Sequence, residues 1–150
     1  MKKFLKLIYQ FFLTAYIFES YPRFKKVNKN GMILFFVKSS KEIKVNKTIQ
    51  KYFKINSSKL NRFKKKSKFI GLKHKNKIIC SGWIYFGNQW NIEEINKKIR
   101  LNKQYLLYDF ITEKKFRNMG YYQLLLRIIQ NKFQKKRLII YALSNNNESV

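Results

Sequence analysis

The chain has 150 residues, 45% of them hydrophobic, which suits one domain (residues 1–150) with a single core. Its formal net charge of +27, from 34 Lys and Arg against 7 Asp and Glu, attracts polyanions such as nucleic acid and anionic lipid. One cysteine and one histidine exclude a disulfide framework and a zinc cluster. Only six basic residues are Arg, and Lys, Asn, Ile, Phe and Tyr are abundant. Such a composition is typical of an AT-rich coding sequence, so we attribute part of the charge to genomic drift.

Residues 1–18 have a basic start followed by an apolar run of about twelve residues, too short to cross a bilayer as a helix. Three interpretations stay open for this segment: an amphipathic helix over residues 1–21 that packs on the core, a helix in a membrane interface, or an uncleaved signal-like anchor. Pro22 ends any such helix. No small-residue cleavage site of a secretory signal peptide follows the run. We expect a cytoplasmic protein, with peripheral membrane contact through residues 1–18 as the alternative.

The next part of the chain predicts one strand, one partial helix and a basic loop. Residues Met32–Lys38 have the pattern of a buried strand, and Lys41–Phe53 fits one helical face in part. Residues Lys54–Lys68 are polar and contain the lysine run 64–66, which is typical of a solvated loop. A nucleic-acid contact is the alternative for this run.

A hairpin is expected over Phe69–Phe86, with its turn at His74–Lys77. Gly82, inside the second strand, indicates a bulge or a close backbone approach. Cys80 is expected to be a small core residue, and a Cys80–His74 catalytic pair is the alternative. Residues Asn91–Arg100 predict a short helix, with Asn91 as its cap and two glutamates in its first turn.

The last third of the chain has the order strand, loop, helix, strand. The strands are expected at Leu106–Thr112 and Leu138–Leu143, the basic loop at Glu113–Asn118, and the helix after Gly120. The helix is indicated by apolar residues at i, i+3, i+4, i+7 and i+8, from Tyr121 to Phe133. This order and length predict a βαβ unit with two parallel strands. Together with the hairpin it gives a mixed α/β (α+β) sheet.

The loop before this helix has the chemistry to hold an anion. Backbone N–H groups at a helix start have no intrahelical partner, and the helix dipole adds partial positive charge there. Gly120 would let the backbone approach a phosphate closely, and Lys114, Lys115 and Arg117 add positive charge. The alternative is an ordinary βαβ turn with a solvated basic rim.

The residues of this loop also resemble a known signature. Residues Arg117–Tyr122, Arg-Asn-Met-Gly-Tyr-Tyr, are similar to the Arg/Gln-x-x-Gly-x-Gly/Ala signature for acetyl-coenzyme A (acetyl-CoA) in the GCN5-related N-acetyltransferase (GNAT) superfamily. Arg117 and Gly120 match, whereas Tyr122 replaces the usual small residue. Residues 146–149, Asn-Asn-Glu-Ser, resemble the family's Asn-x-x-Ser/Ala step. The resemblance covers about the last third of the chain.

The resemblance implies a GNAT-like acyl-CoA N-acyltransferase fold that lacks its C-terminal strands. In the family a helix carrying the tyrosine that protonates the thiolate follows the fifth strand, and this chain ends at Val150, where that helix would begin. We therefore expect a fragment or an incomplete fold whose fifth strand, 138–143, is an exposed edge, and an enzyme that is inactive if the chain is truncated.

In the family, acetyl-CoA is a co-substrate that lies where the fourth and fifth strands diverge, here 104–112 and 138–143. Backbone groups of Phe110, Ile111 and Thr112 would pair with its pantetheine arm. Its pyrophosphate would lie on the N–H groups of the loop. The implied cofactor-binding residues in the rest of the chain are Arg117, Asn118, Met119, Gly120, Tyr121, Tyr122 and Asn146. No metal is implied.

Asp109 and Glu113 are the only carboxylates near this position. Asp109 interrupts an apolar strand, so its burial would require a partner. It is the candidate catalytic base, directly or through water, with a structural hydrogen-bonding role as the alternative.

The function that the resemblance implies is transfer of an acetyl group from acetyl-CoA to a primary amine of a small molecule. Tyr108-Asp109-x-x-Thr112 and Gly120-x-Tyr122 resemble members that modify amino sugars for surface polysaccharides. The alternative is a basic, ribosomal-type RNA-binding protein from an AT-rich genome, which explains the charge directly. A third reading is a membrane-surface protein held by residues 1–18.

Overall fold

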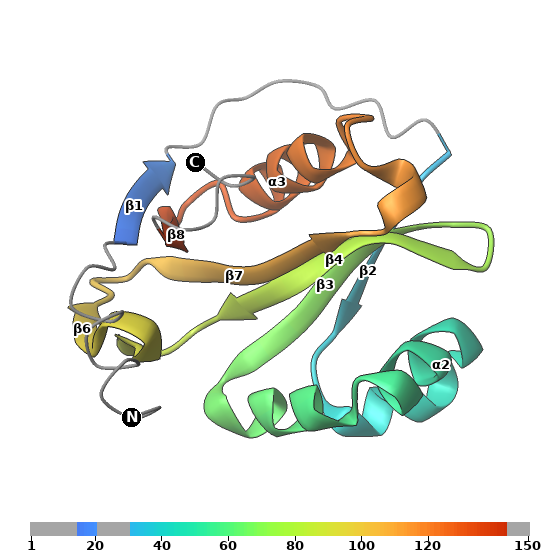
Figure 1. The fold of residues 1–150 in the computed structure, drawn as a ribbon, viewed down its shortest axis with the longest axis horizontal. Helices are drawn as coiled ribbons and strands as arrows, with labels where there is room; N and C mark the ends of the chain where they lie inside the picture. Colours follow the sequence, from blue (N-terminus) through green and yellow to red (C-terminus); the bar gives the residue numbers. More distant parts are fainter. Residues whose placement is uncertain (1–14, 21–30, 144–150) are drawn as a thin grey trace, which may run out of the picture.

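A computed structural model describes residues 15–20 and 31–143, which form a six-stranded sheet flanked by helices (Figure 1). The strand order is β1-β8-β7-β4-β3-β2. These strands are β1 (Ala15–Ser20), β2 (Ile33–Val37), β3 (Ser67–His74), β4 (Lys77–Tyr85), β7 (Tyr105–Thr112) and β8 (Leu138–Leu143). A second, two-stranded sheet contains β5 (Gln89–Ile92) and β6 (Lys97–Arg100). The helices are η1 (Ser40–Val45), α2 (Lys47–Ile55), η2 (Ser57–Lys65), η3 (Glu93–Ile95), η4 (Lys114–Phe116) and α3 (Tyr121–Lys132), where η marks a 3₁₀ helix.

The six-stranded sheet separates two helical layers (Figure 1). Helix α3 packs on one face through Leu125, Ile128 and Ile129, which recur at helical spacing and are all buried. Segments η1, α2 and η2 cover the other face, where Ile49 and Phe53 of α2 pack toward buried rings of β3 and β4. The sheet therefore has a buried core on both sides.

The predicted order of the last third is confirmed. β7 and β8 run parallel and are joined through α3, and the expected hairpin is β3–β4. β2 is the expected strand, and α2 supplies the helix that the pattern in 41–53 indicated only in part. Its start is fixed by Asn46, whose side chain accepts hydrogen bonds from the N–H groups of Thr48 and Ile49 at 3.0 and 3.2 Å.

Two expectations for the middle of the chain are wrong. Residues 54–68 are not a plain loop, because η2 occupies 57–65 and its Leu60 and Phe63 pack against the core of the α2 layer. Residues Asn91–Arg100 form most of the β5–β6 hairpin, and the predicted helix is reduced to the single 3₁₀ turn η3 between the two strands. In β5, Trp90 packs against the core and Ile92 is only 1% exposed, and this burial of alternate residues outweighs the helix-capping pattern.

The expectation of a helix over residues 1–21 is wrong for its described part. Residues 15–20 form β1, which pairs antiparallel with β8 along its whole length, from Ala15 opposite Leu143 to Ser20 opposite Leu138. This pairing also corrects the expected exposed edge, because β1 supplies the backbone partners that β8 would otherwise lack. Residues 1–14 lie outside the described residues, so the interpretations of 1–18 stay predictions.

Within residues 15–20 and 31–143, no helix is both long enough and apolar enough to span a lipid bilayer.

Truncating Phe69 to alanine is expected to lower the free energy of unfolding by about 3–5 kcal/mol. Its ring is fully buried and lies 4.9 to 5.7 Å from the rings of Phe35, Tyr52, Phe53 and Trp83. Urea denaturation measures the change. The matched control is Val45→Ala, whose side chain is 86% exposed and whose loss should change the free energy by less than about 0.5 kcal/mol. Equal effects of the two substitutions would contradict the packing described above.

Candidate functional site

A β-bulge in the middle of β7 organises the candidate site. Tyr108 pairs with Trp83 and Ile111 with Ser81, so Asp109 and Phe110 together lie opposite the single residue Gly82. Asp109 takes the left-handed backbone conformation, with a φ of 49°, which aspartate tolerates better than most residues. The irregularity predicted at Gly82 is therefore present, with the extra residue on the neighbouring strand.

Gly82 is required because Phe110 packs directly on its backbone. A Cβ atom at this position would lie 2.5 Å from the Phe110 ring, far closer than side chains approach one another. The missing side chain lets the Phe110 ring lie on the α3 face of the sheet. The bulge thus sends Phe110 to one face and leaves Asp109 on the other.

Beyond the bulge, β7 and β8 diverge, as the resemblance implied. Their pairing covers only Tyr105–Leu107 of β7 and Leu138–Ile140 of β8. Residues 141–143 of β8 continue to pair with β1 instead. In the described part of the chain, the edge of β7 that faces β8 has no strand partner from Tyr108 to Thr112. Backbone groups of Phe110–Thr112 are therefore available to an extended ligand.

The loop after β7 folds back and opens α3 with a left-handed residue. The backbone N–H of Arg117 donates to the carbonyl of Lys114, and its Nε donates to the carbonyl of Thr112 at 3.3 Å, which ties the loop to the strand end. Asn118 and Gly120 both have positive φ, 59° and 76°. Gly120 is the N-cap residue of α3, and a Cβ built on it meets no atom of the described chain within 4 Å.

The start of α3 has the properties of an anion site. No side chain of the described residues caps the helix, so its first-turn N–H groups stay available. Lys114 and Lys115 are exposed beside it, and Glu113 is the only acidic residue between positions 110 and 147. Open space at Gly120, unsatisfied donors and positive charge all fit a pyrophosphate.

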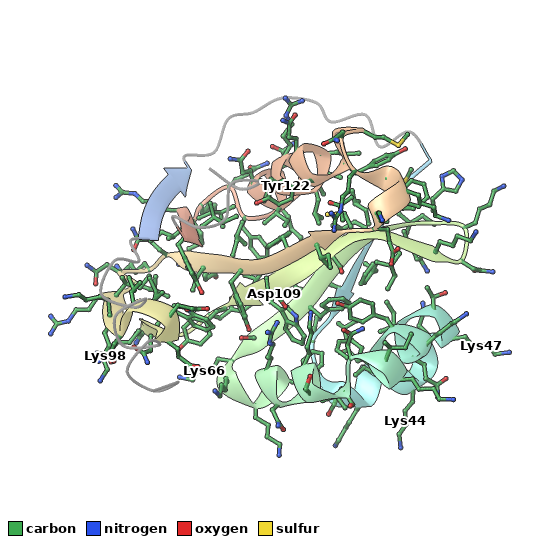
Figure 2. All side chains as sticks on the ribbon, in the orientation of Figure 1. Lys44, Lys47, Lys66, Lys98, Asp109 and Tyr122 are labelled. Atoms are coloured by element: carbon green, nitrogen blue, oxygen red, sulfur yellow. The ribbon has the colours of Figure 1, made fainter. Side chains whose placement is uncertain are left out.

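Tyr122, at the third signature position, does not block the loop. Its ring lies against Phe110, with ring centroids 5.8 Å apart, and its side chain is 36% exposed. Burial against the protein, with a smaller contribution from the nearby Cys80, raises the pKa of Tyr122 to about 12. The phenol is therefore a neutral hydrogen-bond donor at physiological pH. Figure 2 shows Tyr122 and Asp109 on opposite sides of β7.

Cys80 is a core thiol, as expected. It is 1% exposed, and its Sγ accepts a hydrogen bond from Thr112 Oγ1 at 3.3 Å. Burial raises the pKa of Cys80 to about 11, although the hydrogen bond from Thr112 lowers it in part. His74 lies at the hairpin end opposite Lys77, whereas Cys80 is paired with Leu72 further along the strands. The alternative of a Cys80–His74 catalytic pair is therefore wrong.

Asp109 lies on the α2 face and is paired with two cations of η2. Its Oδ2 atom accepts from Arg62 Nη1 and lies 2.9 Å from Lys59 Nζ. The guanidinium of Arg62 in turn lies 5.4 Å from the centre of the Trp83 ring and 5.3 Å from that of Tyr108. The paired carboxylate remains 36% exposed. Asp109 thus has the partners that the sequence analysis required. They come from η2, in the segment that was expected to be a solvated loop.

Two tyrosines and a tryptophan lie beside Asp109 on the same face. Tyr108 donates its hydroxyl hydrogen to Ser67 Oγ at 2.8 Å, and its ring centroid is 4.5 Å from that of Trp90. Tyr141 is the first residue of β8 beyond its pairing with β7. Burial raises the pKa of both tyrosines, and Glu94 adds to the effect at Tyr141. Sequence reasoning missed Tyr141, because it looked like one apolar position in a buried strand.

The residues predicted for the cofactor fall into one continuous segment. Phe110–Thr112 form the open edge of β7, and Arg117–Tyr122 form the turn and first residues of α3. Asn146 lies outside the described residues. Asp109 adjoins the segment in the sequence, but its side chain points to the α2 face, where Arg62 and Lys59 lie.

The fold has counterparts among solved structures. A conserved protein of unknown function from Staphylococcus epidermidis matches 98% of this chain with a TM-score of 0.55 and 12% identity. A protein from Novosphingobium aromaticivorans assigned to the GNAT family of acetyltransferases matches 91% with a TM-score of 0.52 and 8% identity. The chain has the fold of the GNAT acetyltransferases.

The chain covers 59% of the length of the Staphylococcus protein and 55% of the Novosphingobium protein. No protein-family model and no curated protein matches the sequence. At these identities the GNAT likeness establishes the fold.

Cys80 is expected to react slowly with a thiol-specific disulfide reagent while the protein is folded. A pKa of about 11, against 9.0 for an ordinary thiol, lowers the thiolate fraction at pH 8 by about 100-fold. The absorbance of the released thiolate follows the reaction in buffer and again in a denaturing concentration of urea, about 8 M. Equal rates in the two conditions would show that Cys80 is accessible and not part of the core.

Proposed function

We propose that this chain is an acetyl-CoA-dependent N-acetyltransferase that acetylates a primary amine. One observation carries the proposal: the open edge of β7 leads directly from its bulge into a glycine-opened, uncapped helix start. These two features supply what the two ends of the coenzyme need, namely backbone groups for its amide-containing arm and N–H donors for its pyrophosphate.

The residues of this chain would divide the binding between them. Phe110–Thr112 would pair with the pantetheine amides, as an added strand does. The N–H groups of Arg117–Tyr122, together with Lys114 and Lys115, would hold the pyrophosphate. Bound acetyl-CoA supplies a thioester carbonyl that a neutral amine can attack.

The acceptor amine would approach from the α2 face, where Asp109 lies. Lys59 and Arg62 both contact Oδ2 of Asp109, and Oδ1 has no hydrogen-bond donor among the described residues. Oδ1 can therefore accept a proton from the amine, while the contacts at Oδ2 fix the direction of the carboxylate. Asp109 would thus have both expected roles, a structural hydrogen-bonding role through Oδ2 and the role of catalytic base through Oδ1.

Tyr141 is our candidate for the proton donor. It stands where β7 and β8 begin to diverge, and burial raises its pKa, so the phenol, like that of an ordinary tyrosine, is protonated at neutral pH. A protonated phenol beside the reacting thioester can donate a proton to the departing thiolate.

We further propose a small-molecule acceptor, with an amino sugar as the preferred class. Trp90 and Tyr85 are both partly exposed, with ring centroids 4.9 Å apart, and Trp90 also contacts the buried ring of Tyr108, the residue before Asp109. Flat aromatic surfaces of this kind suit the C–H face of a sugar ring. The alternative of a ribosomal-type RNA-binding protein explains the charge, but it gives no role to the open edge of β7.

Replacing Gly120 by glutamate is expected to abolish acetyl-CoA binding, because a bulky anion would occupy the pyrophosphate position. Isothermal calorimetry at moderate salt measures the binding. Gly31→Glu is the matched control: Gly31 also has a positive φ, 72°, and open space around it, but it lies in the turn before β2. Saturable binding by the wild type and the control, lost only in Gly120→Glu, is the predicted result. Weak, salt-screened binding by all three would mean that the lysines attract any anion.

Asp109→Asn is expected to lower kcat by about 100-fold or more and to leave the KM for acetyl-CoA nearly unchanged, since the amide keeps the shape but cannot take a proton. Steady-state acetylation of an amino sugar measures both constants. Glu113→Gln is the control, because it removes a neighbouring exposed carboxylate. An unchanged kcat in Asp109→Asn would leave Asp109 with a structural role only.

A further inference from the structure

Positive charge is concentrated on the layer that covers the α2 face of the sheet. Residues 38–68 contain twelve basic residues and one acidic residue, Glu42. Residues 69–143, more than twice as many, contain only fifteen basic residues and four acidic ones. Basic residues are therefore about twice as dense in this layer, 12 of 31, as in the following part of the described chain, 15 of 75.

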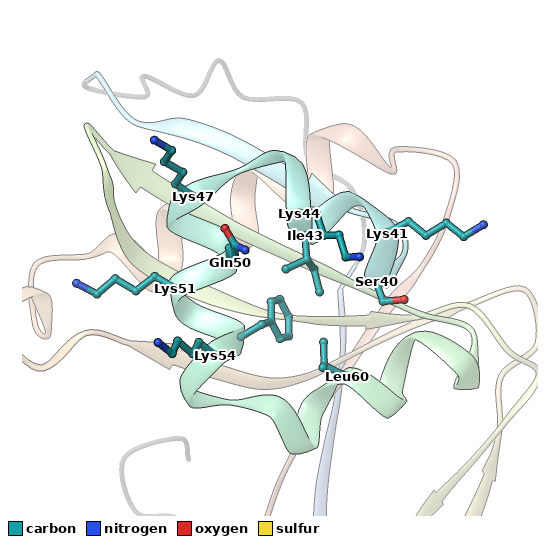
Figure 3. A pocket seen from close by; sticks show the side chains of 10 residues that line it. Ser40, Lys41, Ile43, Lys44, Lys47, Gln50, Lys51, Lys54 and Leu60 are labelled. Atoms are coloured by element: carbon teal, nitrogen blue, oxygen red, sulfur yellow. The ribbon is translucent and has the colours of Figure 1, made fainter.

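The lysines of this layer surround a hollow of about 770 Å³ over η1 and α2 (Figure 3). Five of its lining residues are Lys41, Lys44, Lys47, Lys51 and Lys54, and none is acidic. Glu42, the acidic residue of the segment, is engaged elsewhere, because its Oε2 accepts from the N–H of Lys38 at 2.8 Å. All five lysines are exposed.

This arrangement does not serve the stability of the fold. Lys47 and Lys51 are four residues apart on α2, a spacing at which like charges oppose helix formation. The opposite face of α2 already buries Ile49 and Phe53 against the sheet. An anionic partner would relieve the repulsion among the lysines, so the exposed face fits such a partner.

Two exposed aliphatic side chains adjoin the lysines. Val45, at the end of η1, is 86% exposed, and Ile55, at the end of α2, is 78% exposed. They are the two most exposed large hydrophobic residues of the described chain. Aliphatic side chains add affinity at a lipid surface, because they enter the apolar side of the headgroup region.

We propose that the surface formed by η1, α2 and the five lysines is a docking surface for an anionic membrane. Lysines provide point charges that attract anionic lipid headgroups, and Val45 and Ile55 insert between them. RNA is disfavoured, since the hollow contains no arginine for base contacts and its aromatic residue, Phe53, is only 3% exposed and cannot stack on a base.

This docking would leave the coenzyme loop accessible. Helix α3 and the loop before it lie across the sheet from α2, and Lys44 and Lys47 project away from the sheet (Figure 2). Asp109 is on the α2 face together with the docking surface. The docking inference does not depend on the acetyltransferase proposal, because lipid binding is measured without acetyl-CoA.

Flotation with phosphatidylglycerol vesicles tests the proposal, with phosphatidylcholine vesicles for comparison. Wild-type protein should float with the anionic vesicles only. The triple variant Lys47→Glu, Lys51→Glu and Lys54→Glu should bind them about 100-fold more weakly or worse, since each lysine contributes separately. The matched control, Lys97→Glu, Lys98→Glu and Lys135→Glu, has the same net charge but changes β6 and the segment after α3, and it should keep most of the affinity.

The double variant Val45→Ser and Ile55→Ser tests the contribution of the inserted aliphatic side chains separately from that of the lysine charges. It should weaken vesicle binding and leave the binding of single-stranded RNA unchanged. Circular dichroism confirms that each variant is folded. Three results would overturn the proposal. They are equal loss of vesicle binding in both charge variants, wild-type vesicle affinity in the serine variant, or tighter binding of the docking surface to RNA than to the vesicles.

Discussion

The extra residue in β7 is the constraint on which the site depends. Two residues of β7 lie opposite Gly82, so the alternation of side chains shifts by one at Asp109 and Phe110. Without this shift, Asp109 would follow Tyr105 and Leu107 toward the α3 face, and Phe110 would point to the α2 face. Gly82 makes the shift possible, because only a glycine leaves room for the Phe110 ring. The parallel pairing with β8 also ends at Leu107, just before the bulge.

The bulge also explains the placement of charge. In a regular strand Asp109 would point to the face opposite that of Tyr108, toward the α3 layer. With the bulge, its carboxylate lies on the α2 face and pairs with Lys59 and Arg62 of η2. Arg62 is held in turn by the rings of Trp83 and Tyr108. The two cations hold the partly exposed carboxylate in one orientation, and a proton acceptor has to be oriented toward the group that gives up the proton. The pairing adds little to stability, because exposed ion pairs alter it little, and it fits the role of base that we propose for Asp109.

Much of the fold could be predicted from the sequence because the patterns were local. The helical repeat after Gly120, the apolar run before it and the turn at 74–77 each specify an element without reference to the rest of the chain. The β5–β6 hairpin could not be predicted in this way, since burial of Ile92 and packing of Trp90 decided it against a good helix-start pattern. The same holds for β1, whose strand state depends on pairing with β8, over 100 residues away in the sequence.

For the site, the loop 117–122 and the divergence of the strands followed from the resemblance, and the position of the bulge followed from Gly82. The partners of Asp109 could not be found, because Lys59 and Arg62 are 50 and 47 residues away in a segment that reads as a basic loop. The feature of this segment that could have indicated a partner for Asp109 is Arg62, a single arginine among lysines. Tyr141 gave no signal, since a tyrosine in a buried strand is an ordinary core residue.

The central claim is that acetyl-CoA lies along the open edge of β7 and on the start of α3. Hydrogen–deuterium exchange measured by mass spectrometry, with and without acetyl-CoA, tests it most directly. The account predicts slower exchange in peptides covering residues 108–122 and unchanged exchange over the lysine-rich residues 41–54. Protection confined to 41–54, or no protection in either segment, would contradict it.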